Sequence, residues 1–266
     1  MKVVLFCGGL GMRLRELSEA IPKPMVSLGQ RPILWHVMRY YAHFGHKEFI
    51  LCLGYKGHLI KEYFLNYQET VSNDFVLSEG GRKVELLNAD IQDWRITFVD
   101  TGLDANIGQR LRSVARHLED EERFLANYTD LLSDLPLPRL LEFSAEHDKI
   151  ATFITVPPTQ SFHLVSSAGD GVVTGIRHIG EAGLRINGGF FVFKREMLDY
   201  LGGGEELIYE PFQRLIERRQ IVAYQHEGFW ACMDTFKERQ MLEDMCTRGQ
   251  TPWEVWKCED GPGEDR

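Results

Sequence analysis

A short apolar run followed by a cluster of glycines opens this chain, in the stretch VVLFCGGLGMRL at residues 3–14. The run at 3–7 has the continuous apolar pattern of a strand that is buried on both faces of a parallel sheet. Consecutive small residues after such a strand let backbone N–H groups approach an anion closely. The stretch therefore favours an α/β fold with an anion site at the end of its first strand.

Two common phosphate loops do not fit these glycines. A Rossmann fingerprint needs G-x-G-x-x-G, and Leu14 stands where the third glycine belongs. A Walker loop needs a Gly-Lys-Ser/Thr, which is not found nearby. What remains is a small-residue loop with a fixed positive charge, Arg13, followed by Lys23 in PKPM, where Pro22 and Pro24 keep the backbone extended. Together these two segments indicate a polyphosphate site.

Apolar periodicity in the rest of the chain alternates between buried strands and amphipathic helices. Further strands are predicted at 48–54, 94–100, 124–130, 150–156 and 221–226. Helices are predicted at 32–45, 56–67, 109–118, 139–147, 209–219 and 235–247. A short β excursion is expected after the second helix, and glycine-separated pieces between 157 and 193 predict an antiparallel portion. The expected fold class is α/β, with a Rossmann-like, mostly parallel central sheet flanked by helices and a small antiparallel β portion.

Length and charge limit what the chain can do. A chain of 266 residues with 44% apolar side chains can bury one sizeable core, so residues 1–257 are predicted to form a single domain. The acidic, glycine-rich end at 258–266 is predicted to be disordered. A formal net charge of −9 disfavours nucleic acid and anionic membranes as partners. No apolar run approaches the roughly 20 residues that span a bilayer, and the apolar start is too short for a signal peptide, so a cytoplasmic location is expected.

The cysteines are scattered and show no C-x-x-C spacing. An odd number without metal-ligand spacing indicates neither a disulfide framework nor a zinc site. We therefore expect free, mostly buried thiols at all of them: Cys7, Cys52, Cys232, Cys246 and Cys258.

The stretch CGGLGMRL and the later PKPMV together resemble the two-part signature of the sugar-1-phosphate nucleotidyltransferases. Further segments are most similar to the glucose-1-phosphate cytidylyltransferases of this family, up to about Trp256: RPILWHVMRYY, GYKG, VDTG, INGGFFVF and GFWACMDTFKE. The resemblance implies a fold of the nucleotide-diphospho-sugar transferase type, with a nucleotide-binding half at about 1–135 and a sugar-binding half at about 136–257. It also implies nucleotidyl transfer from CTP to a sugar 1-phosphate, which yields a CDP-sugar and pyrophosphate.

At the phosphate end, the resemblance implies that Arg13 contacts the β- and γ-phosphates and that Lys23 contacts the α-phosphate and the sugar phosphate. The nucleotide would be held by the stretch itself, through Cys7, Gly8, Gly9 and Gly11. Because the attacking phosphate is already an anion, the reaction needs no general base, and catalysis consists of positioning and charge neutralisation.

Two aspartates match the metal ligands of the family. Asp130 ends the strand FLANYTD, at the carboxyl edge where ligands bind in open α/β sheets, and it is also assigned to the nucleotide site. Asp234 in CMDT precedes a predicted helix, where capping that helix is an alternative role. The expected cofactor is Mg²⁺, which prefers carboxylate and phosphate oxygens. The family carries glycines beside the first aspartate, whereas Thr129 and Leu131 stand here, and we expect their side chains to narrow the approach.

The sugar end departs from the family pattern. Asn187 and Gly188 in RINGGFFVF match the sugar contacts of the family. The Glu-Lys-Pro triplet that precedes this strand in the family is replaced by the RHI segment at residues 177–179. The carboxylate that would accept hydrogen bonds from sugar hydroxyls is therefore missing. A cationic contact to phosphate is still expected from Arg177 or His178.

The loop that reads the base also differs, because the Thr-Gly-Gly-Arg of the family appears here as IGQR at residues 107–110. Arg110 matches the family residue and can donate to O2 and N3 of cytosine, which are both acceptors. A place on a solvated helix surface is the alternative for this arginine. Gln109 is new at its position and is also assigned to the nucleotide, with CTP as the leading candidate.

Two other functions stay open on the sequence alone. The same chemistry can act on a non-glucose sugar, a cyclitol or another phosphate acceptor of secondary metabolism, or with another nucleoside triphosphate. The changes around Asp130 and at RHI also suit a non-catalytic, nucleotide-binding regulator. Because members of the family are commonly oligomeric, a homo-oligomer is expected.

Overall fold

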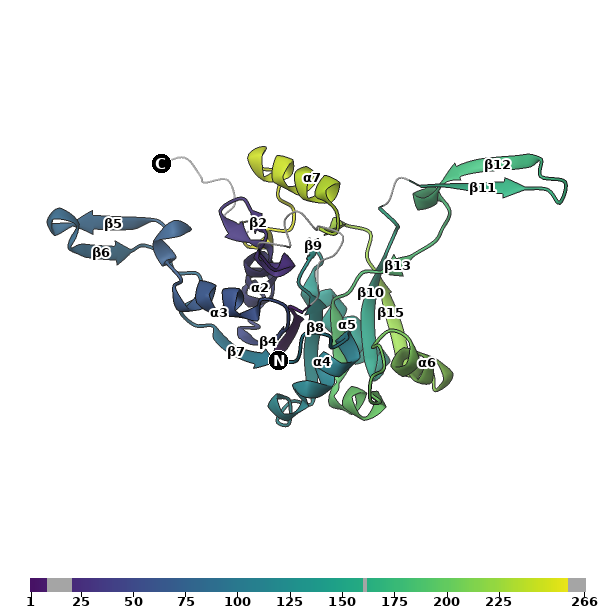
Figure 1. The fold of residues 1–266 in the computed structure, drawn as a ribbon, viewed down its shortest axis with the longest axis horizontal. Coiled ribbons are helices and arrows are strands. Elements are labelled where there is room, and N and C mark those ends of the chain that lie inside the picture. Colours follow the sequence, from purple (N-terminus) through teal and green to yellow (C-terminus); the bar gives the residue numbers. More distant parts are fainter. Residues whose placement is uncertain (9–20, 160–161, 258–266) are drawn as a thin grey trace.

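The structure is a computed structural model that describes residues 1–8, 21–159 and 162–257. Gly9, Gly11 and Arg13 of the glycine stretch lie outside the described residues, as does the acidic end at 258–266. Figure 1 shows a body built around a central sheet, with two hairpins that project from its opposite sides.

The central sheet takes strands from both halves of the chain. Its strands are β1 (Val3–Phe6), β4 (Glu48–Leu53), β7 (Arg95–Asp100), β8 (Arg123–Tyr128), β10 (Ala151–Val156), β13 (Ile186–Asn187), β14 (Phe191–Lys194) and β15 (Ile221–Gln225). They lie in the order β13-β10-β14-β8-β1-β4-β7, and β15 also pairs with β10. The pairs β8–β1, β1–β4, β4–β7 and β10–β15 are parallel, whereas β14 runs antiparallel to β8 and β10. The predicted mostly parallel sheet with an antiparallel portion is confirmed.

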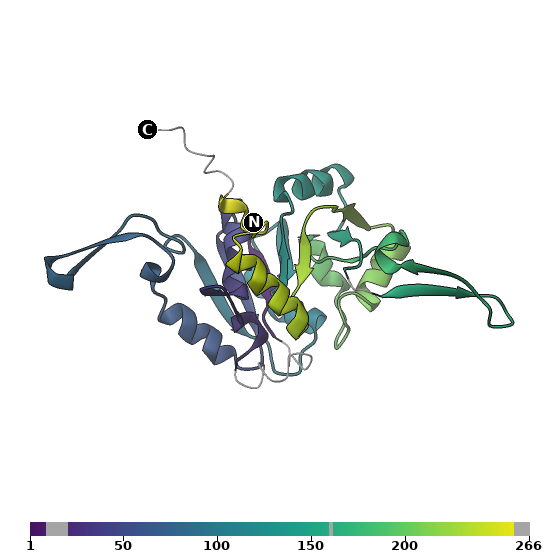
Figure 2. The same ribbon diagram turned by 90° about the horizontal axis from the view of Figure 1, so that it is seen from above.

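Helices cover both faces of this sheet, as Figure 2 shows from above. One apolar core lies under α2 (Ile33–His43), α3 (Gly57–Leu65), α5 (Leu137–His147) and α7 (Phe236–Thr247). The second lies under α4 (Ile107–Ser113) and α6 (Glu210–Glu217). Successive residues of a strand point to opposite faces, so Val3 and Leu5 join the first core while Val4 and Phe6 join the second. Burial on both sides explains the unbroken apolar pattern of β1.

Capping residues fix where two helices begin. Asn106 starts α4 with a capping box that Gln109 closes, and Thr235 starts α7 with a capping box that Glu238 closes. The helix predicted at 109–118 is shorter in the structure, because α4 gives way to a 3₁₀ turn at Ala115–His117.

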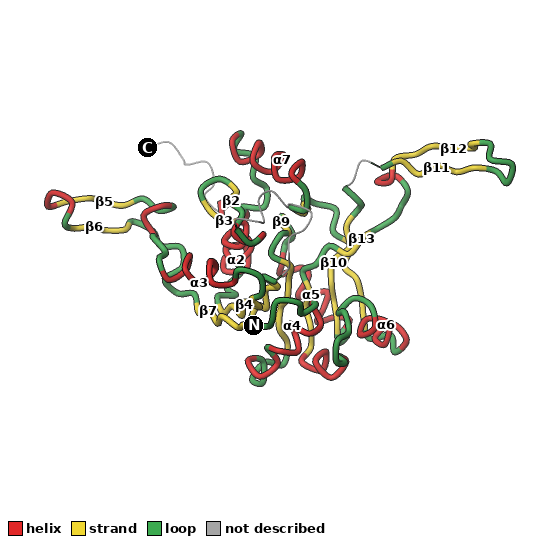
Figure 3. Tube along the Cα trace, in the orientation of Figure 1, coloured by secondary structure: helices red, strands yellow, loops and turns green. Residues whose placement is uncertain are grey.

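Four short antiparallel strand pairs lie outside the central sheet among the described residues. They are β2 (Ser27–Leu28) with β3 (Arg31–Pro32), β5 (Phe75–Ser78) with β6 (Lys83–Leu86), β9 (Leu131–Ser133) with β16 (Trp230–Cys232), and β11 (His163–Ser167) with β12 (Val173–His178). Figure 3 shows β5–β6 and β11–β12 as long arms with few neighbours along their length. The β excursion expected after the second helix is therefore the β5–β6 hairpin.

The described cysteines agree with the sequence expectation. Cys7 and Cys52 are buried free thiols, and Cys232 and Cys246 are partly buried free thiols. Cys258 lies outside the described residues. Across the described ranges, no helix combines the length and the apolar character that crossing a bilayer requires.

Candidate functional site

Lys23 is presented by a single rigid turn. It begins a 3₁₀ turn at Lys23–Met25, which is preceded by Pro22 in an extended conformation and contains the buried Pro24. The N–H of Val26 donates to the carbonyl of Lys23 and closes the turn. Because proline fixes its own φ and restricts the residue before it, this backbone holds the Lys23 Cα in place. Freedom to move is left mainly to the lysine side chain.

Asp130 and Asp234 are brought together by the pairing of β9 with β16. Asp130 follows β8 at the carboxyl edge of the sheet, and Leu131 at the start of β9 lies opposite Cys232 at the end of β16. The N–H of Met233 donates to the carbonyl of Asp130 over 2.9 Å. The next residue after this bond is Asp234, so the register of two short strands places the two aspartates side by side.

Lys23 lies between these two carboxylates. Its Nζ donates to Asp130 Oδ2 over 2.5 Å and to Asp234 Oδ1. The three side chains are 16%, 21% and 35% exposed, respectively. Burial lowers the pKa of Lys23, but the charge and hydrogen bond of Asp130 and the hydrogen bond of Asp234 outweigh it and hold that pKa above its usual value. The lysine is therefore a permanent cation between two anions.

The same place offers ligand atoms for a metal ion. Ligand atoms of Asp130, Cys232 and Asp234 all lie within 4.8 Å of one another. Burial raises the pKa of the Cys232 thiol, and the charges of the two aspartates raise it further, so this residue is a neutral thiol at neutral pH. Two carboxylates beside a neutral thiol suit a hard, oxygen-preferring divalent cation better than a soft one. The ammonium of Lys23 demonstrates that a cation fits between these carboxylates.

Capping does not explain Asp234, because Thr235 is the N-cap of α7. The Thr235 hydroxyl accepts from the N–H of Glu238, and the Glu238 carboxylate accepts from the N–H groups of both Asp234 and Thr235. The alternative that Asp234 only caps this helix is thus wrong. Its carboxylate is directed to Lys23 instead.

Arg110 lies at the carboxyl ends of β4 and β7. It is 1% exposed, which overturns the alternative of a solvated helix surface. Its guanidinium donates to the carbonyls of Leu53, Gly102 and Leu103 and to the Thr101 hydroxyl. These acceptors follow or end β4 and β7, so the arginine ties the two strands together at the edge where Asp130 lies.

Two glycines make room for this arginine. A Cβ added to Gly8 would lie 2.0 Å from the Arg110 Cζ, and one added to Gly54 would lie 2.8 Å from its Nη1. Gly8 follows Cys7, whose N–H continues the β1–β4 ladder by donating to the carbonyl of Cys52 over 3.1 Å. The start of the glycine stretch is thus in contact with the residue assigned to the base. Gln109, next to Arg110, uses its side-chain oxygen to accept from the N–H of Asn106 and close the capping box.

Asn187 ends β13, and Gly188 begins the break between β13 and β14. The Asn187 Oδ1 accepts from the N–H of Gly189, and the Gly188 carbonyl accepts from Trp230 Nε1, each over 2.9 Å. A Cβ at Gly188 would lie 2.7 Å from Ile154 Cγ1. Close packing against Ile154 therefore requires a glycine at this position.

Arg177 and His178 lie at the end of β12, in the projecting hairpin. Arg177 is exposed, and His178 accepts at Nδ1 from the N–H of Gly180. Figure 1 shows this hairpin reaching away from the sheet, while β9 lies at the centre of the body.

Thr129 and Leu131 do not narrow the approach to Asp130. They are 4% and 5% exposed, and the Thr129 hydroxyl donates to the carbonyl of Phe6 over 3.2 Å. Both side chains fill the interior, while the Asp130 side chain keeps 21% of its surface exposed. The expectation of a narrowed approach is wrong because these side chains turn inward.

Cys232 and Gly54 were missed by sequence reasoning. Cys232 ends β16 two residues before Asp234, and this short separation from a candidate metal ligand is a signal that was available. Gly54 has an equally plain signal, since this glycine ends the predicted strand 48–54, much as Gly8 comes directly after the predicted strand 3–7.

The chain is similar to nucleotidyltransferases in both sequence and fold. A family model described as nucleotidyl transferase matches residues 2–243. The glucose-1-phosphate cytidylyltransferase of Salmonella typhi is 38% identical, over 97% of this chain and 100% of that protein. A probable glucose-1-phosphate cytidylyltransferase of Bacillus subtilis is 36% identical, over 96% and 100%. Among solved structures, UDP-glucose pyrophosphorylase from Acinetobacter baumannii shares the fold with a TM-score of 0.68 and 16% identity, over 97% of each chain.

Proposed function

Because this chain belongs to the nucleotidyl transferase family, we propose that it transfers the cytidylyl group of CTP to a sugar 1-phosphate and releases pyrophosphate. The identity of 38% to a glucose-1-phosphate cytidylyltransferase, over 97% of the chain, supports CTP and a sugar 1-phosphate as substrates. The observation that carries the proposal is the convergence of Lys23, Asp130 and Asp234 at the carboxyl edge of the sheet.

The reaction is a direct displacement at phosphorus. An oxygen of the sugar phosphate attacks the α-phosphorus of CTP, and a new P–O bond forms. The bond from the α-phosphorus to the oxygen that bridges to the β-phosphate breaks, and pyrophosphate leaves with that electron pair. No proton has to be removed, so the protein contributes orientation and positive charge. Lys23 supplies part of that charge, because its pKa is held above its usual value and it stays protonated.

Asp130 and Asp234 would hold Mg²⁺ in this reaction. Their carboxylates are the hard oxygen ligands that this ion prefers, and the neutral thiol of Cys232 does not compete for it. Bound there, the ion would neutralise charge on the triphosphate and on the departing pyrophosphate.

Nucleotide contacts are proposed for the edge formed by the ends of β1 and β4. The proposed contacts are Cys7, Gly8 and Arg110. Their placement is supported by the contact of the arginine with Gly8 and by the four acceptors that hold its guanidinium at this edge. Gly9, Gly11 and Arg13 keep the roles that the sequence implies at the nucleotide and the β- and γ-phosphates. Gln109 stays a proposed nucleotide residue. Its side-chain oxygen already accepts from the N–H of Asn106, so Gln109 would contact the nucleotide through its amide nitrogen or after this hydrogen bond breaks.

The acceptor is proposed to be glucose 1-phosphate or another sugar 1-phosphate, with contacts at Asn187 and Gly188. Arg177 and His178 remain proposed phosphate contacts, which requires the β11–β12 hairpin to approach the site or a phosphate to bind at its base. The RHI segment is the reason to test acceptors other than glucose 1-phosphate.

A matrix of nucleoside triphosphates against phosphate acceptors, with Mg²⁺ and pyrophosphate detection, tests the function. We expect pyrophosphate release with CTP and a sugar 1-phosphate. Release with another nucleotide or another acceptor would replace the proposed substrates while keeping the chemistry. CTP binding with no pyrophosphate from any pair would contradict catalysis.

We also propose a cytoplasmic homo-oligomer. Free thiols at four described cysteines support a reducing compartment. Exposed apolar side chains on both projecting hairpins support association between copies of the chain, among them Leu77, Val84, Val165 and Ile176.

A further inference from the structure

We propose that Lys23 is the resident cation of the Asp130–Asp234 pair and that it competes with a divalent cation for the same carboxylates. On arrival of the metal and nucleotide, the ammonium moves from the carboxylates to a phosphate. This inference rests on the proposed function, because it takes the two aspartates as the metal ligands.

The hydrogen bonds of Lys23 carry the proposal. One Nζ donates to both carboxylates, which come from segments 107 and 211 residues away along the chain. The lysine side chain is 16% exposed, so solvent screens these contacts less than it screens a surface ion pair. An ammonium in this position neutralises charge that would otherwise leave two carboxylates repelling each other across β9 and β16.

Lys23 cannot serve the carboxylates and the phosphates at the same time without a rearrangement. A divalent cation on the same oxygens would repel the ammonium, whereas an incoming triphosphate would attract it. The turn between Pro22 and Pro24 fixes the backbone, so the movement belongs to the flexible side chain.

A thermodynamic consequence follows from this exchange. Metal alone has to displace the lysine and leave it without an anionic partner, whereas metal with nucleotide offers the lysine a phosphate. Metal and nucleotide should therefore bind cooperatively, and each should raise the affinity for the other by the same factor. Without Lys23, the metal should bind well on its own and most of this cooperativity should vanish.

The test is a titration with Mn²⁺ in the absence of nucleotide, in which the electron paramagnetic resonance signal of the free ion measures how much Mn²⁺ is bound. Lys23→Met keeps the length of the side chain and removes its charge, and Lys23→Arg is the matched control that keeps the charge. We expect Lys23→Met to bind Mn²⁺ about tenfold more tightly than the unmodified protein, or better, because an opposite charge at this range shifts a carboxylate equilibrium by about 1–3 decades. Lys23→Arg should stay within about threefold of the unmodified protein. Equal affinity of Lys23→Met and the unmodified protein would overturn the proposal.

Folding and the metal assignment need separate checks. If Lys23→Met does not fold, the rise of the thermal unfolding midpoint with Mn²⁺ is compared between Lys23→Gln and the unmodified protein: a larger rise in the variant supports the proposal, and an equal rise overturns it. Asp130→Asn and Asp234→Asn are titrated with Mn²⁺ in the presence of CTP. Undiminished binding in these variants would contradict the metal site of the proposed function. Diminished binding there, together with no gain in Lys23→Met, would contradict the lysine exchange alone.

Discussion

At the residue scale, the contact with Arg110 explains why position 8 is a glycine. The Arg110 guanidinium lies against its backbone, 2.0 Å from where a Cβ would stand, and that guanidinium is already committed to four acceptors. An arginine with 1% exposure has little space into which it could retreat. Gly8 and Arg110 therefore form one structural unit at the end of β1.

Replacing Gly8 with Ala is expected to lower the free energy of unfolding by about 1–3 kcal/mol, because overpacking forces Arg110 away from buried acceptors. The measurement is urea denaturation. Gly203→Ala is the control, since its Cβ would meet only Arg112 Nη1 at 3.7 Å, and its effect should stay within about 0.5 kcal/mol. Equal stability of the two variants would show that the guanidinium moves without cost.

Lys23→Ala is expected to reduce kcat by at least about a hundredfold, because it removes a protonated group assigned to the transferring phosphate. Steady-state pyrophosphate release measures it. The control is Lys47→Ala, which removes an exposed lysine paired with the exposed Asp93 and should leave kcat unchanged. Turnover near that of the unmodified protein in Lys23→Ala would remove Lys23 from the catalytic assignment.

Sequence reasoning reached Lys23 and the two aspartates because each stands in a short motif. It assigned Asp234 to the metal but left helix capping open as an alternative, although the T-x-x-E spacing of Thr235 and Glu238 is a readable capping box. The inward turn of Thr129 and Leu131 was beyond reach, because the direction of a side chain after a strand depends on what packs there.

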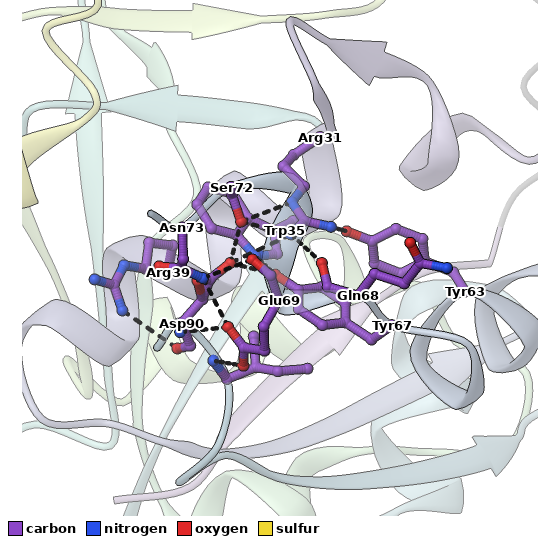
Figure 4. A network of polar contacts seen from close by, with 11 residues as sticks. Arg31, Trp35, Arg39, Tyr63, Tyr67, Gln68, Glu69, Ser72, Asn73 and Asp90 are labelled. Carbon is purple, nitrogen blue, oxygen red and sulfur yellow. Dashed lines mark hydrogen bonds and ion pairs between the residues drawn. The ribbon is translucent and has the colours of Figure 1, made fainter. Parts of the chain in front are cut away.

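At the scale of elements, a polar network centred on the buried Arg31 and Asp90 attaches the β5–β6 hairpin to the body (Figure 4). The Asp90 carboxylate accepts from the hydroxyls of Tyr67 and Ser72 and from the amide of Asn73, and it lies 3.4 Å from Arg31 Nη2. These contacts close the base of the hairpin, where the chain leaves α3 and returns toward β7.

Glu69 completes this network from the other side. Its carboxylate accepts from the N–H of Asp90 over 2.8 Å and from the N–H of Ile91 over 3.2 Å. Burial raises the pKa of Asp90, but the hydrogen bonds from Ser72, Tyr67 and Asn73 outweigh it and hold that pKa below its usual 3.8. The ionised form of Asp90 is thus the one that the fold stabilises.

Asp90→Asn is expected to lower the free energy of unfolding by about 1–3 kcal/mol at neutral pH and to speed amide exchange in the hairpin. The native pKa is depressed, so the contribution of Asp90 is present above pH 3.8 and is lost as the pH falls through its lower native pKa. Urea midpoints measured against pH should therefore fall less steeply at the acid end in the variant. Asp93→Asn, at an exposed carboxylate 61% open to solvent, is the control and should follow the unmodified protein. Coincident pH profiles for all three proteins would contradict this role of Asp90.

Elements were easier to predict than the contacts between them. The strand and helix periods located β1, β4, α2 and α5 within a few residues, because burial on one or two faces leaves a pattern in the sequence. The pairing of Arg31 with Asp90 leaves no such pattern, since the two lie 59 residues apart and meet only after the hairpin folds back.

At the scale of the whole molecule, strand order assembles the site. Parallel pairing of β8, β1, β4 and β7 puts the ends of these strands on one edge, and the antiparallel β14 joins the second half of the chain to the first. The sequence predicted alternating strands and helices and an antiparallel portion. It did not predict that β8 has β1 on one side and β14 on the other, because pairing between distant strands is decided by packing of the complete sheet.

The two projecting hairpins carry exposed apolar side chains that the proposed oligomer would cover. In the β11–β12 hairpin, Val165 lies opposite Ile176, and these apolar side chains are 59% and 66% exposed. An isolated two-stranded hairpin is only marginally stable in water, so a partner that covers this face would stabilise it. A second copy of the chain is the proposed cover for this face. Val165→Lys combined with Ile176→Lys should therefore yield a smaller species in light scattering coupled to size exclusion, because it would bury charge at the contact. Ser166→Lys adds a charge to the opposite face and should leave the assembly intact. A monomeric unmodified protein, or an unchanged mass in the double variant, would exclude this hairpin as the contact.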